Sequence, residues 1–194
     1  MAEVVLFHHV LGQTDGLLAF AAELRADGHT VHTPDLFDGA TFESIGEGVA
    51  FAKNAGFGAI AERGLRAVDG LPNELVYAGF SMGVMAAQQL AQLRPGARGA
   101  LLFEACIPTS EWGSWPANVP VQIHGMESDE FFAGAGDIDA ARALIEEASA
   151  TARAELFIYP GDGHLFADSS SSSYDSEAAA LLTQRALDFL RSIG

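Results

Sequence analysis

The sequence predicts an α/β fold: a mostly parallel sheet of about six strands with helices on both faces. Short apolar runs rich in β-branched residues alternate along the chain with longer helix-like segments. The runs are almost continuously apolar, which is typical of parallel strands buried on both faces. The length of 194 residues fits one domain covering residues 1–194. Together these observations favour a doubly wound sheet.

Six apolar runs are expected to form the strands. They cover residues 4–9, 30–36, 74–80, 99–105, 119–125 and 154–160. Parallel strands all end at one edge of their sheet, and open α/β sheets bind ligands outside that carboxyl edge. Chemically active residues that directly follow these runs are therefore the best candidates for a functional site.

The segments between the strands carry helical patterns. Residues 14–27 have Thr14 as an N-cap, an apolar stripe and Gly28 as a stop signal. The region 44–69 contains five glycines, so a broken helix is expected there. Further helices are expected at residues 82–93, 137–152 and 176–192. The serine run at 169–173 is typical of a polar surface loop.

Charge and composition exclude several classes of partner. The formal net charge is −16, and no cluster of Lys and Arg is present to bind nucleic acid or an anionic membrane. Cys106 is the single cysteine, so no internal disulfide is possible. No apolar run approaches the roughly 18 residues of a membrane span, and the N-terminus lacks the pattern of a secretion signal. A cytoplasmic protein is expected.

The segment Gly79-Phe80-Ser81-Met82-Gly83 has the G-x-S-x-G pattern of a nucleophile elbow. The pattern alone occurs often by chance. Here it follows a predicted strand and opens a predicted helix, which is the context that the elbow requires. The alternative is a glycine-rich packing turn with an inactive serine. We expect Ser81 to be a nucleophile.

A serine nucleophile requires a histidine base and an acid, which follow it in the chain order Ser, acid, His. His124 lies inside a predicted strand, where a histidine packed in the core is the better interpretation. His164 follows a strand end on a glycine-rich loop and is the expected base. For the acid, Asp129 is preferred, although spacing does not exclude Glu127, and Asp162 is a weaker alternative.

An oxyanion hole would complete the site with two backbone N–H groups. One belongs to the residue after the nucleophile, here Met82. The other comes from the loop after the first strand, where Val10 is the natural donor. Gly12 would let this loop turn close to the substrate.

With these residues identified, the chain resembles the dienelactone hydrolase family of α/β-hydrolases over nearly its whole length. The segments that carry the likeness are HTPDLFDG at 32–39, GFSMG at 79–83, ESDEFF at 127–132 and YPGDGHLFAD at 159–168. The resemblance implies the α/β-hydrolase fold, here without a lid domain, and it favours Asp129 over Glu127. It also implies a triad of Ser81, Asp129 and His164, no metal, no cofactor, and intracellular hydrolysis of small esters or lactones.

Three positions depart from the usual family pattern. Ser81 stands where dienelactone hydrolases typically carry cysteine, which makes the chain a serine-nucleophile variant. His9 takes the place of a glutamate in the oxyanion loop. Asp168 falls near an arginine that helps to hold the carboxylate of the dienelactone. An acid at that position would repel an anionic lactone, by about 1 kcal/mol for a pair 4 Å apart in water. A neutral ester is therefore the expected substrate.

A small-molecule substrate pocket is expected beside the serine, lined by His9, Phe37, Phe80 and Phe166. Adjacent His8 and His9 would point to opposite faces of the sheet, so no metal site is predicted from them. The predicted activity is hydrolysis of carboxylic esters or lactones by a monomer or homodimer. The alternatives are a catalytically silent binding protein and an acyltransferase or thioesterase with the same triad.

Overall fold

The computed structural model describes residues 1–194 and contains one sheet of six parallel strands. The strand order is β2-β1-β3-β4-β5-β6. The strands are β1 (Glu3–Phe7), β2 (Thr30–His32), β3 (Val76–Phe80), β4 (Gly99–Phe103), β5 (Val121–Met126) and β6 (Ala154–Tyr159). Every neighbouring pair is parallel. This arrangement confirms the predicted α/β class and the number of strands.

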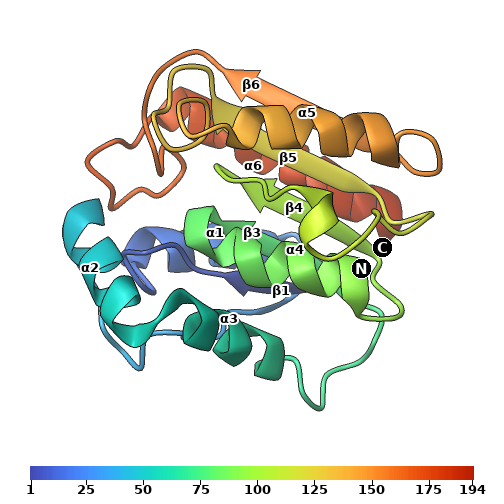
Figure 1. The fold of residues 1–194 in the computed structure, drawn as a ribbon, viewed down its shortest axis with the longest axis horizontal. Helices are drawn as coiled ribbons and strands as arrows, with labels where there is room; N and C mark the ends of the chain where they lie inside the picture. The colour runs from blue at the N-terminus through green and yellow to red at the C-terminus, as the bar shows by residue number, and fades with distance from the viewer.

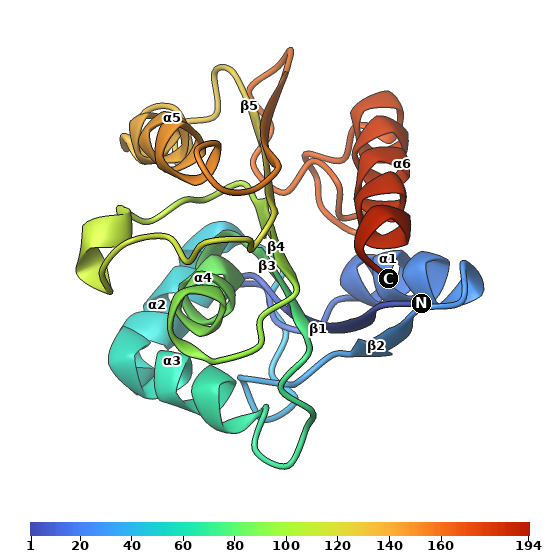
Figure 2. The same cartoon turned by 90° about the vertical axis from the view of Figure 1, so that its right-hand side faces the viewer.

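Helices cover both faces of the sheet, as Figure 2 shows along the strands. The helices are α1 (Asp15–Ala26), α2 (Ile45–Ala55), α3 (Phe57–Arg66), α4 (Val84–Leu93), α5 (Asp137–Ala148) and α6 (Ser176–Ile193). Helices α1 and α6 pack on one face, and α2 to α5 pack on the other. None of these helices is both long and apolar enough to cross a membrane.

Two details of the elements differ from or refine the sequence prediction. The region 44–69 forms two helices that meet at Gly56, whose φ of 86° only glycine adopts without strain. Strand β2 ends at His32, although an extension to residue 36 was expected. Pro34 has no N–H to continue the ladder, and the Leu36 N–H donates to a side chain instead.

The core consists of two apolar clusters separated by the sheet. One contains 29 buried residues under helices α2 to α5, and the other contains 22 under α1 and α6. Strands β3, β4 and β5 are buried along their whole length. The three strands β3, β4 and β5 are therefore covered on both faces, whereas the edge strands β2 and β6 are partly exposed.

The carboxyl ends of the strands lie on the left in Figure 1. The loops that follow β1, β3, β4, β5 and β6 gather at this edge, close to the N-terminal end of α4. These loops contain Ser81, Asp129 and His164. The topology thus brings together residues that are up to 83 positions apart in the sequence.

Candidate active site

Ser81 lies on a sharp turn between strand β3 and helix α4. Its φ of 48° is in the left-handed region, where only a few per cent of non-glycine residues are found. A Cβ on Gly79 would lie 2.5 Å from the carbonyl carbon of Gly83, and a Cβ on Gly83 would lie 2.4 Å from the Phe7 carbonyl oxygen. Both glycines are therefore required by close backbone approaches, and the turn holds the Ser81 side chain above the sheet edge.

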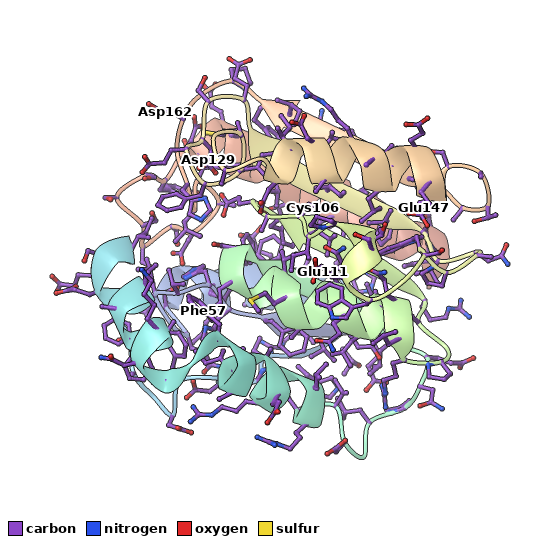
Figure 3. All side chains as sticks on the ribbon, in the orientation of Figure 1. Phe57, Cys106, Glu111, Asp129, Glu147 and Asp162 are labelled. Atoms are coloured by element: carbon purple, nitrogen blue, oxygen red, sulfur yellow. The ribbon has the colours of Figure 1, made fainter.

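The structure brings Ser81, His164 and Asp129 into one hydrogen-bonded chain. Ser81 Oγ lies 2.8 Å from His164 Nε2, and His164 Nδ1 lies 2.7 Å from Asp129 Oδ2. Asp129 is fully buried and His164 is 6% exposed. The alternative acids lie elsewhere, because Glu127 and Asp162 are exposed on the surrounding loops. Figure 3 labels Asp129 and Asp162 at this end of the molecule.

This geometry defines the protonation pattern of His164. With Nδ1–H donating to the Asp129 carboxylate, Nε2 is left as an acceptor for the Ser81 hydroxyl. Burial lowers the pKa of His164, but the hydrogen bond to Asp129 and the charges of Glu104, Asp129 and Asp137 outweigh it. The net result is a pKa above the ordinary value, which makes His164 a stronger base.

Asp129 is itself held by its loop. Its Oδ1 accepts a hydrogen bond from the Phe131 N–H at 2.8 Å, while Oδ2 receives the one from His164. The Phe131 ring lies 4.7 Å from the His164 ring, measured between centroids, and shields it on one side. Both oxygens of the acid are thus occupied, which fixes the plane of the imidazole.

The loop after β1 turns tightly toward Ser81. Gly12 has a φ of 86°, and its N–H donates to the His9 carbonyl. A Cβ on Gly48 would lie 2.0 Å from the Val10 carbonyl oxygen, so helix α2 packs directly against this loop. The Val10 N–H has no hydrogen-bond partner within the chain. An N–H group without a partner in the chain is one requirement of the oxyanion-hole donor expected at Val10.

His9 and Asp168, two of the departures from the family pattern, meet in the interior. His9 Nε2 donates to Asp168 Oδ2 at 2.6 Å, and His9 Nδ1 accepts from the Leu11 N–H. Asp168 also accepts hydrogen bonds from the hydroxyls of Thr14 and Ser170. Burial raises the pKa of Asp168, but these hydrogen bonds dominate and hold it well below the ordinary value.

This pairing corrects the expected role of Asp168. The side chain was expected to oppose an anionic substrate, but it is 3% exposed and fully engaged by the chain. Instead, the pair ties the oxyanion loop to the loop that carries His164. The sequence did not predict that His9 would be the partner of Asp168, because only the fold brings residues 9 and 168 together.

The four residues expected to line a pocket lie in the interior. His9 and Phe166 are fully buried, and Phe37 and Phe80 are 1% and 2% exposed. Phe80 stacks on Phe103, and Phe37 packs against His8. These side chains pack in the core beneath the loops of the site, and none of them lines the cavity beside the loop after β1.

His8, which directly follows β1, and His124 on β5 are both fully buried and hydrogen-bonded within the chain. His8 points to the face opposite His9, donates from Nδ1 to the His9 carbonyl and accepts the Leu36 N–H at Nε2. Burial lowers its pKa to about 4. His124 is buried between Tyr159 and Gln122, and burial lowers its pKa to about 3. No group of three or more His, Cys, Asp or Glu side chains is arranged to hold a metal.

Glu104 is a residue of this region that the sequence interpretation missed. It directly follows strand β4, is 1% exposed, and accepts the Phe166 N–H at Oε1. A lone acid in the apolar run GALLFEA was the available signal. Charged residues are almost never fully buried without a partner, so an acid at the end of a buried strand implies a partner nearby.

A cavity of about 670 Å³ opens beside the oxyanion loop. Hydroxyl-bearing and acidic side chains dominate its lining, including Thr14, Asp15, Thr41, Glu43 and Ser170. No Lys or Arg lines it. Ser81, His164 and Asp129 are not part of this lining, so the cavity does not contain the hydrogen-bonded chain.

The parallel sheet, the strained serine turn and the loops at the carboxyl edge define the α/β-hydrolase class. The model of the dienelactone hydrolase family matches residues 1–194. The chain therefore belongs to the dienelactone hydrolase family and is a hydrolase. No curated protein sequence matches it significantly.

Solved structures show the same fold at low sequence identity. A dienelactone hydrolase-like promiscuous phosphotriesterase from metagenomic libraries is 16% identical, with a TM-score of 0.74 over 100% of this chain and 87% of that chain. A protein of the α/β hydrolase superfamily from Xanthomonas campestris pv. campestris is 23% identical, with a TM-score of 0.66 over 99% of both chains. Esterase 2 of Thermogutta terrifontis, solved as its cyclosarin phosphonyl adduct, is 17% identical, with a TM-score of 0.65 over 100% of this chain and 83% of that chain.

Proposed function

We propose that the protein is a serine hydrolase that cleaves carboxylic esters or lactones of small molecules. The observation that carries the proposal is the hydrogen-bonded chain from Ser81 Oγ through His164 to Asp129, with distances of 2.8 and 2.7 Å. A serine hydroxyl becomes a nucleophile only when such a base accepts its proton. The raised pKa of His164 supports that role.

The reaction proceeds in two halves. Ser81 Oγ attacks the ester carbonyl while His164 Nε2 takes its proton, and the N–H groups of Val10 and Met82 hold the tetrahedral oxyanion. The Asp129 carboxylate stabilises the imidazolium, which then protonates the leaving alcohol. A water molecule, deprotonated by the same histidine, attacks the acyl-enzyme and releases the acid, which restores the Ser81 hydroxyl.

The lining of the cavity beside the loop after β1 favours neutral over anionic substrates. Asp15 and Glu43 contribute carboxylates, and no cationic side chain is present there to pair with an anionic lactone. The net charge of −16 acts in the same direction. These cavity carboxylates, and not the buried Asp168, would oppose an anionic substrate, so the proposed substrates are uncharged esters or lactones with hydroxyl or other polar substituents.

Hydrolysis of a short p-nitrophenyl ester tests the proposal. Wild-type protein should release p-nitrophenol, and Ser81→Ala and His164→Ala should each lower kcat by about 10³-fold or more. A catalytically silent binding protein would show no release that depends on Ser81. Faster product formation with an added alcohol or thiol acceptor would indicate acyl transfer instead.

A serine-directed phosphonate gives a readout that does not depend on choosing the right ester. The related Thermogutta terrifontis esterase forms a phosphonyl adduct, and the same reagent class should add one phosphonyl group to this chain. Peptide mass spectrometry should locate the group on Ser81, and Ser81→Ala should remain unmodified. An unchanged mass of the wild-type protein, together with no esterase activity, would refute the proposed function.

A further inference from the structure

Glu104 lies beside the candidate active site but has no part in the mechanism above. In the register of the sheet, Phe103 on β4 pairs with Phe80 on β3, so Glu104 and Ser81 are the next residues at two adjacent strand ends. Both have a left-handed backbone, with φ values of 62° and 48°. Such non-glycine conformations are costly and concentrate at functional sites.

The carboxyl group of Glu104 is only half satisfied. Oε1 accepts the Phe166 N–H at 2.8 Å, but Oε2 is buried and has no hydrogen-bond partner. A buried polar atom without a partner costs stability, so its retention calls for an explanation. Phe166 is two residues beyond His164, and Glu104 therefore holds the loop that carries the base.

We propose that Glu104 is a positioning residue for His164, anchoring the histidine loop through one oxygen and supplying a second buried negative charge beside the imidazolium through the other. The proposal rests on the proposed function, because the imidazolium forms when His164 takes the Ser81 proton. Asp129 contacts His164 directly, whereas Glu104 acts on it through space and through Phe166.

The charges around this pair give the direction of the effect. The charges that act on the Glu104 carboxyl are those of His164, Asp129 and Asp168. The Phe166 N–H donates to this carboxyl, and the Glu104 N–H donates to the carbonyl of His124, whose side chain is uncharged. Burial raises the pKa of Glu104 to about 7, and the positive charge of His164 opposes that rise. The negative charges of Glu104, Asp129 and Asp137 in turn raise the pKa of His164. An ionised Glu104 therefore strengthens His164 as a base.

Glu104→Gln separates the charge from the anchor, because the amide oxygen still accepts the Phe166 N–H. Loss of the charge should move the titration of the His164 imidazole to lower pH, as followed by NMR. Glu127→Gln, which removes an exposed carboxylate from a neighbouring loop, should leave this titration unchanged. An identical His164 titration in wild type and Glu104→Gln would overturn the proposal. This measurement needs no substrate, so it remains decisive even if the proposed esterase activity fails.

Kinetics supply the second readout. In Glu104→Gln, kcat/KM on the alkaline plateau should fall about tenfold, with the loss in kcat and little change in KM, since the imidazolium loses a favourable charge. The acid limb of the pH profile should move to lower pH in parallel with the NMR titration. A decrease in kcat/KM by the same factor at every pH, with the acid limb unmoved, would indicate a purely structural role and would also overturn the proposal.

A measurement on the wild-type chain covers the case in which Glu104→Gln does not fold. With ¹³C-labelled glutamate side chains, the Glu104 carboxyl resonance should titrate near neutral pH, far above the exposed glutamates. Phosphonylation of Ser81 should change that titration, because it perturbs His164. A Glu104 carboxyl that stays protonated over the whole pH range in which the His164 imidazole titrates, or that shows no response to that titration, would overturn the proposal.

Discussion

At the scale of single residues, the proposed mechanism makes the protonation of His164 responsible for the pH range of activity. The base must be neutral to accept the Ser81 proton, and its pKa is raised by Asp129 and the nearby carboxylates. Activity should therefore rise with pH through a midpoint above about 6.5, the value of an unperturbed histidine. A profile of kcat/KM against pH, measured with a neutral ester, tests this expectation.

Asp129→Asn should lower kcat by about 10⁴-fold, because an amide stabilises the wrong tautomer of His164 and provides no charge for the imidazolium. Any remaining activity should have its acid limb at lower pH than in wild type. Asp162→Asn is the matched control, since Asp162 is an exposed acid on the loop that carries His164. Equal losses in the two variants would show that the hydrogen bond to Asp129 is not what matters.

The His9–Asp168 pair should contribute to both stability and rate. The folded pKa of Asp168 is depressed, so its stabilising effect is present above the unfolded value of about 4 and is lost as the pH falls below it. Asp168→Asn should lower the free energy of unfolding by about 2 kcal/mol at pH 7, and the deficit should shrink in acid. Urea unfolding at several pH values measures this dependence.

The same substitution should reduce kcat about tenfold with little change in KM, because the oxyanion loop that carries Val10 loses its tie to the histidine loop. Asp69→Asn removes an exposed acid without side-chain hydrogen bonds in the structure and provides the control. A deficit of the same size for both variants, or one that does not change with pH, would argue against the proposed contribution of the pair.

At the scale of elements, the turn between β3 and α4 depends on glycine for steric reasons. A Cβ at Gly83 would meet the Phe7 carbonyl oxygen at 2.4 Å, and strand β1, which carries Phe7, cannot retreat because it is hydrogen-bonded between β2 and β3. Gly83→Ala should therefore cost about 2 kcal/mol of stability and displace Ser81 enough to reduce kcat by about 10²-fold.

Gly58→Ala is the control for that change. Gly58 lies in helix α3, and a Cβ added to it would have no other atom within 4 Å. Alanine is favoured over glycine in a helix by up to about 1 kcal/mol, so this variant should be as stable as wild type or slightly more stable. Thermal unfolding and esterase assays of the two variants would discriminate a local steric effect from a general effect of added methyl groups.

The sequence predicted the elements well, because each strand and helix is encoded locally by its apolar pattern. The elbow residues were also foreseeable, since Gly79, Ser81 and Gly83 lie within one short segment. Contacts between loops that are distant in the sequence could not be predicted. The pairing of His9 with Asp168 and the burial of Glu104 depend on where the strand ends converge, and no local pattern specifies that.

The predicted pocket residues illustrate the same limit. Phe80 and Phe166 lie next to residues of the candidate site in sequence, yet both point into the cluster under α1 and α6. Successive strand residues alternate between faces, and near a strand end a small change in backbone direction decides which face a side chain takes. The sequence therefore predicted that these residues lie near the site, but it could not predict whether their side chains pack in the core or line a pocket.

At the scale of the whole molecule, the excess of acidic residues should determine which substrates reach the site. The net charge is −16, and Asp15 and Glu43 line the cavity beside the oxyanion loop. For two esters that differ only by a carboxylate, kcat/KM should be about tenfold lower for the anionic one at low ionic strength. Raising the salt concentration to about 0.2 M should narrow this gap, because surface charges are then screened within about 10 Å.

Glu43→Gln and Glu146→Gln distinguish the effect of a carboxylate in the cavity from the effect of the net charge of the whole chain. Both change the net charge equally, but Glu146 is exposed on helix α5 and does not line the cavity. Glu43→Gln should raise kcat/KM for the anionic ester several-fold while leaving the neutral ester unchanged, since the nearby charge contributes most. Glu146→Gln should leave both rates at the wild-type level. If the two variants behave alike, the cavity beside the oxyanion loop does not select the substrate, and long-range repulsion alone would account for the preference.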